Sequence, residues 1–275
     1  MGTLRVPQVV PSPSQDCERL RKAFQGWGTD ENAVIQVLGH RNASQRRKIR
    51  DTYQELYNES LLDSLESELS GDFGRAVILW TLDPPERDAK LAKEALLRVI
   101  IEIACASSPN HLMAVRQAYC SLFNCSLEED ILSKLLVSLV SSYRYDREVV
   151  DEAIADAEAA QLHDAVVMLI LSTRNVFQLR ATFECYRENY GIPIDQLEYI
   201  LKVVVWCIEA PEKHFAEIVR ASVVGLGTDE DSLTRCIVSR AEIDMMKIKE
   251  EYNKTSLVIG DTSGDYQNFL MTLLG

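Results

Sequence analysis

Residues 26–31 read Gly-Trp-Gly-Thr-Asp-Glu, and residues 225–230 repeat this stretch as Gly-Leu-Gly-Thr-Asp-Glu. In both copies the second glycine lies thirteen residues before an arginine, Arg41 or Arg240. A second matched stretch follows each copy: residues 68–73 read Glu-Leu-Ser-Gly-Asp-Phe, and residues 261–266 read Asp-Thr-Ser-Gly-Asp-Tyr. Glycines allow a backbone to turn its carbonyl oxygens toward one point, and a distant carboxylate adds negative charge. The pattern therefore indicates two sites for a hard cation such as Ca²⁺.

The two loops belong to a longer internal repeat. Aligning Arg41 with Ser107, Arg174 and Arg240 gives spacings of 66, 67 and 66 residues. Twelve residues after each of these positions stands a tyrosine, namely Tyr53, Tyr119, Tyr186 and Tyr252. The chain therefore consists of four repeats of about 66 residues. Such a unit is longer than a two-helix solenoid repeat, so we expect four or five helices in each.

The apolar residues predict an all-α fold. They recur at helical spacing, as in Val34, Val37 and Leu38, and no Asn-Gly or Asp-Gly hairpin is flanked by alternating apolar residues. Ser126-Leu-Glu-Glu129 is a capping-box pattern that opens a helix. We expect an amino-terminal tail at 1–13 and repeats at 14–83, 84–146, 147–210 and 211–275, the last three of them shortened.

Charge and composition limit the function. A net charge of −13 disfavours nucleic acid and anionic membranes, unless bound divalent cations reverse the local charge. Residues 1–13 lack the pattern of a secretory signal, and no run of eighteen apolar residues could span a bilayer. The seven cysteines are an odd number scattered through helical segments, which is typical of reduced thiols. We expect a cytoplasmic protein that does not bind nucleic acid.

These residues resemble the annexin family, and its plant branch in particular. The plant-like features are residues 26–29, 38–43, 82–89 and 141–145. The resemblance covers the chain from about Ser14 to Gly275. It implies a curved disc of four repeats with about five helices each, and calcium sites on the convex face that bind anionic phospholipid. It also implies a peripheral membrane protein when calcium is bound, with possible self-association on membranes.

The resemblance assigns calcium ligands residue by residue. In the first repeat they are the carbonyls of Phe24, Gly26 and Gly28, with Glu68 as bidentate acid forty residues after Gly28. In the fourth repeat they are the carbonyls of Val223, Gly225 and Gly227, with Asp261 as the acid. Since Ca²⁺ takes six to eight oxygens, each set leaves positions for water or lipid phosphate.

The fourth repeat departs from the family pattern. Asp261 lies only 34 residues after Gly227, and the second and third repeats contain no glycine-threonine loop before Ser107 or Arg174. Either these loops are deleted, or the sequence omits residues that the family has. If the deletions are real, the fourth site is in doubt and the second and third sites are absent.

Several residues allow two interpretations. Trp27 and Leu226 lie at the tips of the two loops, where insertion into a membrane or packing on the neighbouring helix is expected. A threonine or an aspartate of each loop is a candidate for the helix N-cap, and Thr29 and Thr228 suit that role. His40 would be the centre of a weak peroxidase-like activity, although a histidine without a distal partner is a poor haem signal. A calcium-independent helical scaffold with decayed sites is the other alternative. Our main interpretation is a calcium-dependent phospholipid-binding protein that is not an enzyme.

Glu102 and Arg235 are charged residues on otherwise apolar helices. The resemblance places both along a central channel between the repeat halves. Because a lone buried charge is costly, we expect them to form an ion pair.

Overall fold

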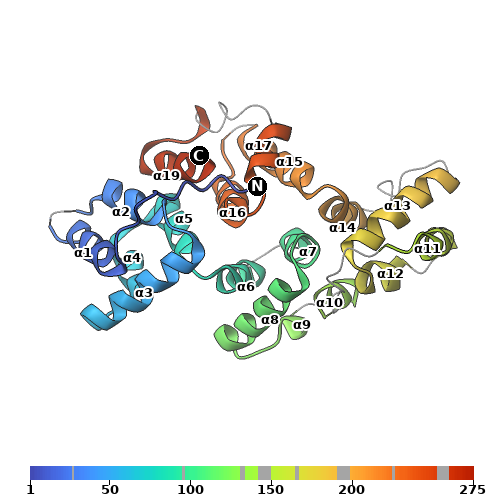
Figure 1. Cartoon of the computed structure of the whole chain (residues 1–275), viewed down its shortest axis with the longest axis horizontal. Helices are drawn as coiled ribbons and strands as arrows, with labels where there is room; N and C mark the ends of the chain where they lie inside the picture. Colours follow the sequence, from blue (N-terminus) through green and yellow to red (C-terminus); the bar gives the residue numbers. More distant parts are fainter. Residues whose placement is uncertain are drawn as a thin grey trace. The chain divides into compact units, whose positions relative to one another are not determined.

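The computed structural model describes residues 1–26, 28–94, 97–130, 134–141, 150–164, 167–190, 199–224, 227–252 and 260–275. Every regular element in these ranges is a helix, so the expected all-α fold is confirmed (Figure 1). No helix among the described residues is long and apolar enough to cross a bilayer.

The helices follow the order of the repeats. The first repeat contains α1 (Pro13–Ala23), α2 (Glu31–Leu38), α3 (Ala43–Tyr57), α4 (Leu61–Glu68) and α5 (Gly71–Thr81). The next segment contains α6 (Pro84–Glu94), α7 (Leu97–Ala106), α8 (Pro109–Phe123), α9 (Leu127–Asp130) and α10 (Lys134–Ser141). Then come α11 (Glu152–Asp164), α12 (Val167–Thr173), α13 (Val176–Tyr190) and α14 (Tyr199–Glu209). The last segment contains α15 (Pro211–Val223), α16 (Glu230–Arg240), α17 (Met245–Tyr252) and α19 (Gly264–Leu274).

The chain divides into two compact units. Unit 1 consists of residues Met1–Arg87 and Phe215–Gly275, and unit 2 consists of Asp88–His214. In unit 1, α5 contacts α16, and in unit 2, α14 contacts α7. Helix α16 ends at the aligned anchor Arg240, and α7 ends one residue before its anchor. Helices α5 and α14 carry tryptophans at matching positions, Trp80 and Trp206. The two units are therefore built around the same pair of helices from the repeat.

Short polar residues begin several helices, as their hydrogen-bonding chemistry predicts. Ser12 and Asn42 form capping boxes with Gln15 and Gln45. The capping box expected at Ser126 is confirmed, because its N–H donates to Glu129 Oε2 over 2.9 Å and its Oγ accepts from the Glu129 N–H over 3.3 Å.

The aligned arginines each pair with an acid of the same unit. The Nε and Nη2 atoms of Arg41 donate to both carboxylate oxygens of Asp16, over 2.7 and 2.8 Å, and both side chains are buried. Arg240 makes the same two-pronged contact with Asp244, over 2.8 and 2.5 Å, and Arg174 pairs with Glu158. The four aligned tyrosines are all buried. Arg41, Arg240 and the four tyrosines are therefore core residues, which explains why they recur, whereas Arg174 is exposed.

The first residues of the chain are fixed to unit 1. The Thr3 N–H donates to Ala241 O over 2.8 Å, and its hydroxyl donates to Leu273 O over 2.6 Å. The Met246 N–H donates to Met1 O over 3.0 Å. A Cβ on Gly2 would lie 2.5 Å from Ala241 O, so only glycine fits between these bonds. We call Met1–Thr3 the amino-terminal segment.

The buried charge of Glu102 is balanced within unit 2. Arg98 Nε lies 3.1 Å from Glu102 Oε1, and His214 Nε2 lies 3.0 Å from the same atom. Arg235 is buried in α16 of unit 1. The pairing of Glu102 with Arg235 stays a prediction.

Candidate metal-binding loops

The first loop connects α1 and α2 and is closed by a backbone hydrogen bond. The Asp30 N–H donates to Ala23 O over 2.9 Å, and the Asp30 carboxylate accepts from the Ala33 N–H over 2.9 Å. Of the two candidate residue types, the aspartate and not the threonine is used, because Asp30 is the N-cap of α2. Within the loop Gly26 and Gly28 have φ of 135° and 90°, a backbone conformation that favours glycine.

The distant acid lies against this loop. The Thr29 hydroxyl is within 3.2 Å of Glu68 O and 3.1 Å of Glu68 Oε2. Glu68 is the last residue of α4 and is exposed. The threonine is free to make these contacts because the neighbouring aspartate caps the helix. Two residues that are 39 positions apart in sequence are thereby joined at the loop.

The second loop, between α15 and α16, has the same hydrogen bonds. The Asp229 N–H donates to Ser222 O over 2.8 Å, and its carboxylate caps α16 by accepting from the Ser232 N–H over 3.0 Å. The Thr228 hydroxyl donates to Asp261 O over 2.9 Å. Gly227 has φ of 93°, close to that of Gly28. Asp229, and not Thr228, is therefore the cap here too.

The shorter spacing of the fourth repeat does not move its acid away from the loop. Tyr252 corresponds to Tyr53, and the missing residues fall between Tyr252 and Asp261. Burial, and then the charge of Asp261, raise the pKa of the Tyr252 phenol. Glycines of similar φ follow the two acids, with 60° at Gly71 and 62° at Gly264. The backbone carbonyl of Asp261 is therefore bonded to its loop as that of Glu68 is, and the role of Asp261 as a metal ligand stays a prediction.

The expected membrane-contact residues cannot be located. Trp27, Gly225 and Leu226 lie outside the described residues. The remaining expected ligands, Phe24, Gly26, Gly28, Glu68, Val223, Gly227 and Asp261, are all described.

The donor set of the first loop fits a hard cation. No hydrogen bond within the described residues uses the carbonyl oxygens of Phe24, Gly26 or Gly28. In the same described ranges, no three His, Cys, Asp or Glu side chains gather as a metal site. A metal held by the described part of this loop would therefore depend on backbone carbonyls and one carboxylate, which suits Ca²⁺ and not a soft transition metal.

The second and third repeats have fewer residues between the helices that correspond to α1 and α2. Two residues, 95 and 96, separate α6 from α7, and two residues, 165 and 166, separate α11 from α12. The first repeat has seven residues at the corresponding place, from Phe24 to Asp30. This agrees with the expectation that the middle repeats carry no glycine-threonine site.

His40 lies in the turn that follows α2. Its carbonyl accepts a hydrogen bond from Arg41 Nη1 over 3.1 Å, and its buried Nδ1 has no hydrogen-bond partner within the described residues. Nothing in these contacts is specific to haem, so the peroxidase-like activity stays an alternative hypothesis.

Comparisons with known proteins agree with the fold and the repeat. A family model described as Annexin matches residues 15–80, 87–136 and 214–273. Annexin D3 of Arabidopsis thaliana is 51% identical, in an alignment of 318 residues that covers 100% of this chain and 99% of that protein. The structure of annexin III has 30% identity and a TM-score of 0.93, covering 100% of this chain and 97% of that one. The structure of calcium-bound annexin (Sm)1 has 28% identity and a TM-score of 0.88, covering 100% and 93%.

Proposed function

The chain belongs to the annexin family, whose members generally bind phospholipid in a calcium-dependent way, and we propose that it does so through two loops. The single observation that supports this proposal is the threonine bridge. In both loops the threonine hydroxyl donates to the backbone carbonyl of the distant acid, over 3.2 Å in one and 2.9 Å in the other.

The first site would consist of the carbonyls of Phe24, Gly26 and Gly28 and the carboxylate of Glu68. The second would consist of the carbonyls of Val223, Gly225 and Gly227 and the carboxylate of Asp261. Calcium supplies a positive charge between this acidic chain and an anionic lipid headgroup. The protein supplies a loop whose shape is fixed beforehand by the hydrogen bonds of Thr29, Asp30 and their counterparts.

Membrane binding on this proposal is peripheral and reversible. Three carbonyls and one bidentate carboxylate provide about five oxygens, whereas Ca²⁺ accepts six to eight. The open positions would hold water in solution and lipid phosphate oxygens at a membrane. We place Trp27 and Leu226 at the lipid headgroups and the calcium-free protein in the cytoplasm, and we assign no enzymatic activity.

Vesicle sedimentation tests the proposal. The protein should pellet with phosphatidylserine-phosphatidylcholine vesicles in the presence of calcium and stay in the supernatant with a chelator. The double variant Glu68→Gln with Asp261→Asn should stay in the supernatant under both conditions. Equal pelleting with and without calcium, or none at all, would favour the helical scaffold. A haem absorption band in the purified protein, lost on His40→Ala, would favour the peroxidase-like alternative.

A further inference from the structure

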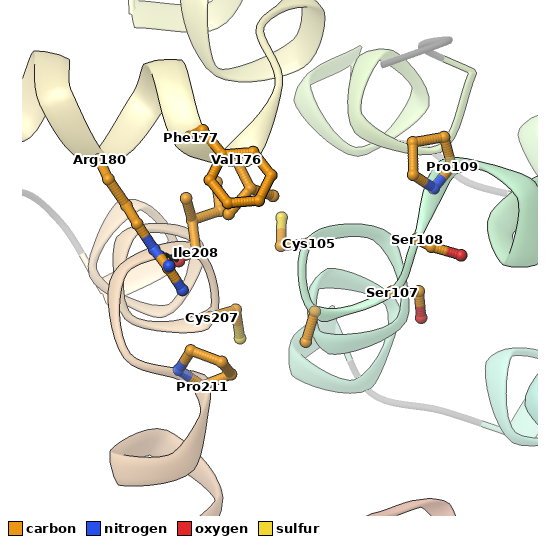
Figure 2. A pocket seen from close by; sticks show the side chains of 11 residues that line it. Cys105, Ser107, Ser108, Pro109, Val176, Phe177, Arg180, Cys207, Ile208 and Pro211 are labelled. Carbon is orange, nitrogen blue, oxygen red and sulfur yellow. Dashed lines mark hydrogen bonds between the residues drawn. The ribbon is translucent and has the colours of Figure 1, made fainter. Parts of the chain in front are cut away.

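Unit 2 contains a cavity of about 260 Å³ that the proposed calcium sites do not use. The ends of α7 and α14 form part of its wall with Cys105, Cys207 and Ile208, and the first turn of α13 adds Val176 and Phe177 (Figure 2). Arg180 lines the same cavity and is itself exposed. The wall is mostly apolar and contains one cation.

The repeat shows what occupies the corresponding place in unit 1. The alignment of Arg174 with Arg240 relates the third repeat to the fourth. It matches residues 175–177 with residues 241–243, and Arg180 with Met246. At the ends of the matching helices, Cys207 and Ile208 correspond to Leu274 and Gly275. The cavity wall in the third repeat therefore has a counterpart in the fourth repeat.

The amino-terminal segment lies on that counterpart. Thr3 bonds to Ala241 and Leu273, and Met1 accepts from the N–H of Met246, as described above. Gly275 is close to this segment as well, since a Cβ on it would lie 2.6 Å from Thr3 O. In unit 1 a non-helical piece of chain thus lies against the counterparts of three cavity residues, Val176, Arg180 and Ile208.

The opposite wall also has a counterpart. Cys105 to Pro109 correspond to Gly39 to Ala43. In unit 1 the Ala43 N–H donates to Glu242 Oε1 over 2.8 Å, so this stretch faces the same region of the fourth repeat. In unit 2 no described residue covers the space between the two walls, and the cavity results.

We propose that this cavity binds a short extended peptide of a partner protein, one with apolar side chains and a carboxylate. The extended backbone follows from the amino-terminal segment at the corresponding positions. The carboxylate follows from Arg180, which stands where unit 1 has the uncharged Met246. Among the described residues its guanidinium makes one hydrogen bond, from Nε to Ile208 O over 3.1 Å. Its two terminal nitrogens are thereby available for a bidentate contact.

The probes for this site are two labelled peptides. The first has the sequence of residues 1–8, and the second is identical except for Met1→Asp, the position that in unit 1 is bonded to the counterpart of Arg180. Both are acetylated, so that only the second carries a new charge near the site. Their affinities for the full chain are measured by fluorescence anisotropy. We expect the aspartate peptide to bind about tenfold more tightly, as a charge-assisted hydrogen bond implies.

Three variants locate the binding. Arg180→Gln should abolish the difference between the peptides, whereas Arg187→Gln, an exposed arginine of the same helix that does not line the cavity, should preserve it. Ala106→Phe places a ring in the cavity and should remove binding of both peptides, with circular dichroism as the check on folding. If Ala106→Phe unfolds the protein, the Arg180 and Arg187 variants still show whether the peptides bind at this cavity.

Two results would overturn the proposal. Peptide binding that is unchanged by both Arg180→Gln and Ala106→Phe would lie elsewhere, for example in unit 1. Complete displacement of the aspartate peptide by an equal concentration of phenylacetate would show a site for small organic anions and not for an extended chain.

Discussion

The two glycine-threonine loops have matching backbone hydrogen bonds among their described residues, and different acids. Both are closed by an aspartate N–H, and both are joined to the distant acid by a threonine hydroxyl. At the first loop the hydroxyl also lies 3.1 Å from the Glu68 carboxylate, whereas only the backbone carbonyl of Asp261 is bonded at the second. Aspartate is one methylene shorter than glutamate, so its carboxylate reaches less far from the same backbone position.

This comparison distinguishes two properties of each acid, namely where its backbone lies and how far its side chain extends from that backbone. The spacing of 34 residues in place of 40 puts the fourth site in doubt when only sequence is considered. In the structure the threonine hydroxyl is bonded to the backbone carbonyl of the acid in both loops, although the intervening chains differ in length. What still differs between the loops is the length of the acidic side chain.

The largest expected effect is the loss of one carboxylate. Glu68→Gln keeps the shape of the side chain and removes its charge and bidentate grip, so calcium-dependent vesicle binding should fall by about tenfold or more. Asp261→Asn should reduce vesicle binding less, because the shorter aspartate side chain should hold calcium more weakly from the start. Calcium titrations of vesicle sedimentation measure both. Equal losses, or a larger loss with Asp261→Asn, would show that reach does not rank the two sites.

The sequence predicted the repeat, the helices and the pairing of each loop with an acid. The repeat and the helices were predicted correctly because Arg41, Arg240 and the four aligned tyrosines are core residues, and core packing imposes regular spacing. The pairing of each loop with a metal-binding acid stays a prediction. The sequence left the N-caps open between threonine and aspartate, since both suit that position and only the fold shows that Asp30 and Asp229 are used. The balance of Glu102 by Arg98 and His214 was missed because His214 lies 112 residues away, with no repeated signature.

The next effect concerns the glycines. At φ near 90° a residue with a Cβ is strained, so Gly28→Ala and Gly227→Ala should each lower the free energy of unfolding by about 1–3 kcal/mol. No atom lies within 4 Å of the added Cβ at either position, so the cost is conformational and should be equal in the two loops. Gly260→Ala is the control, because its surroundings are equally open and it lacks a positive φ. Urea denaturation measures all three, and an unchanged midpoint for Gly28→Ala would argue against this loop backbone.

A smaller effect should follow from the threonine bridges. Thr29→Val and Thr228→Val keep the side-chain shape and remove one donor, which is worth about 1 kcal/mol, or roughly fivefold in affinity. We expect the larger loss of calcium affinity with Thr29→Val, because this hydroxyl contacts the carboxylate as well as the carbonyl. Isothermal titration calorimetry measures the affinities, with Ser239→Ala, in α16 and outside both loops, as a control. If the threonine variants bind calcium as the unmodified protein does, the bridges are not what positions the acids.

The smallest effect should come from lengthening the acidic side chain of the second loop. Asp261→Glu gives the fourth repeat the acid of the first, on a backbone that is already bonded to Thr228 in the same way. If side-chain reach is the remaining difference between the loops, calcium affinity at this loop should rise by about threefold, which is less than 1 kcal/mol. The variant is best measured with Glu68→Gln present, so that the fourth site alone is titrated. A decrease in affinity would mean that the fourth loop is shaped for the shorter acid. The two loops would then differ in their backbone around the cation and not merely in the length of one side chain.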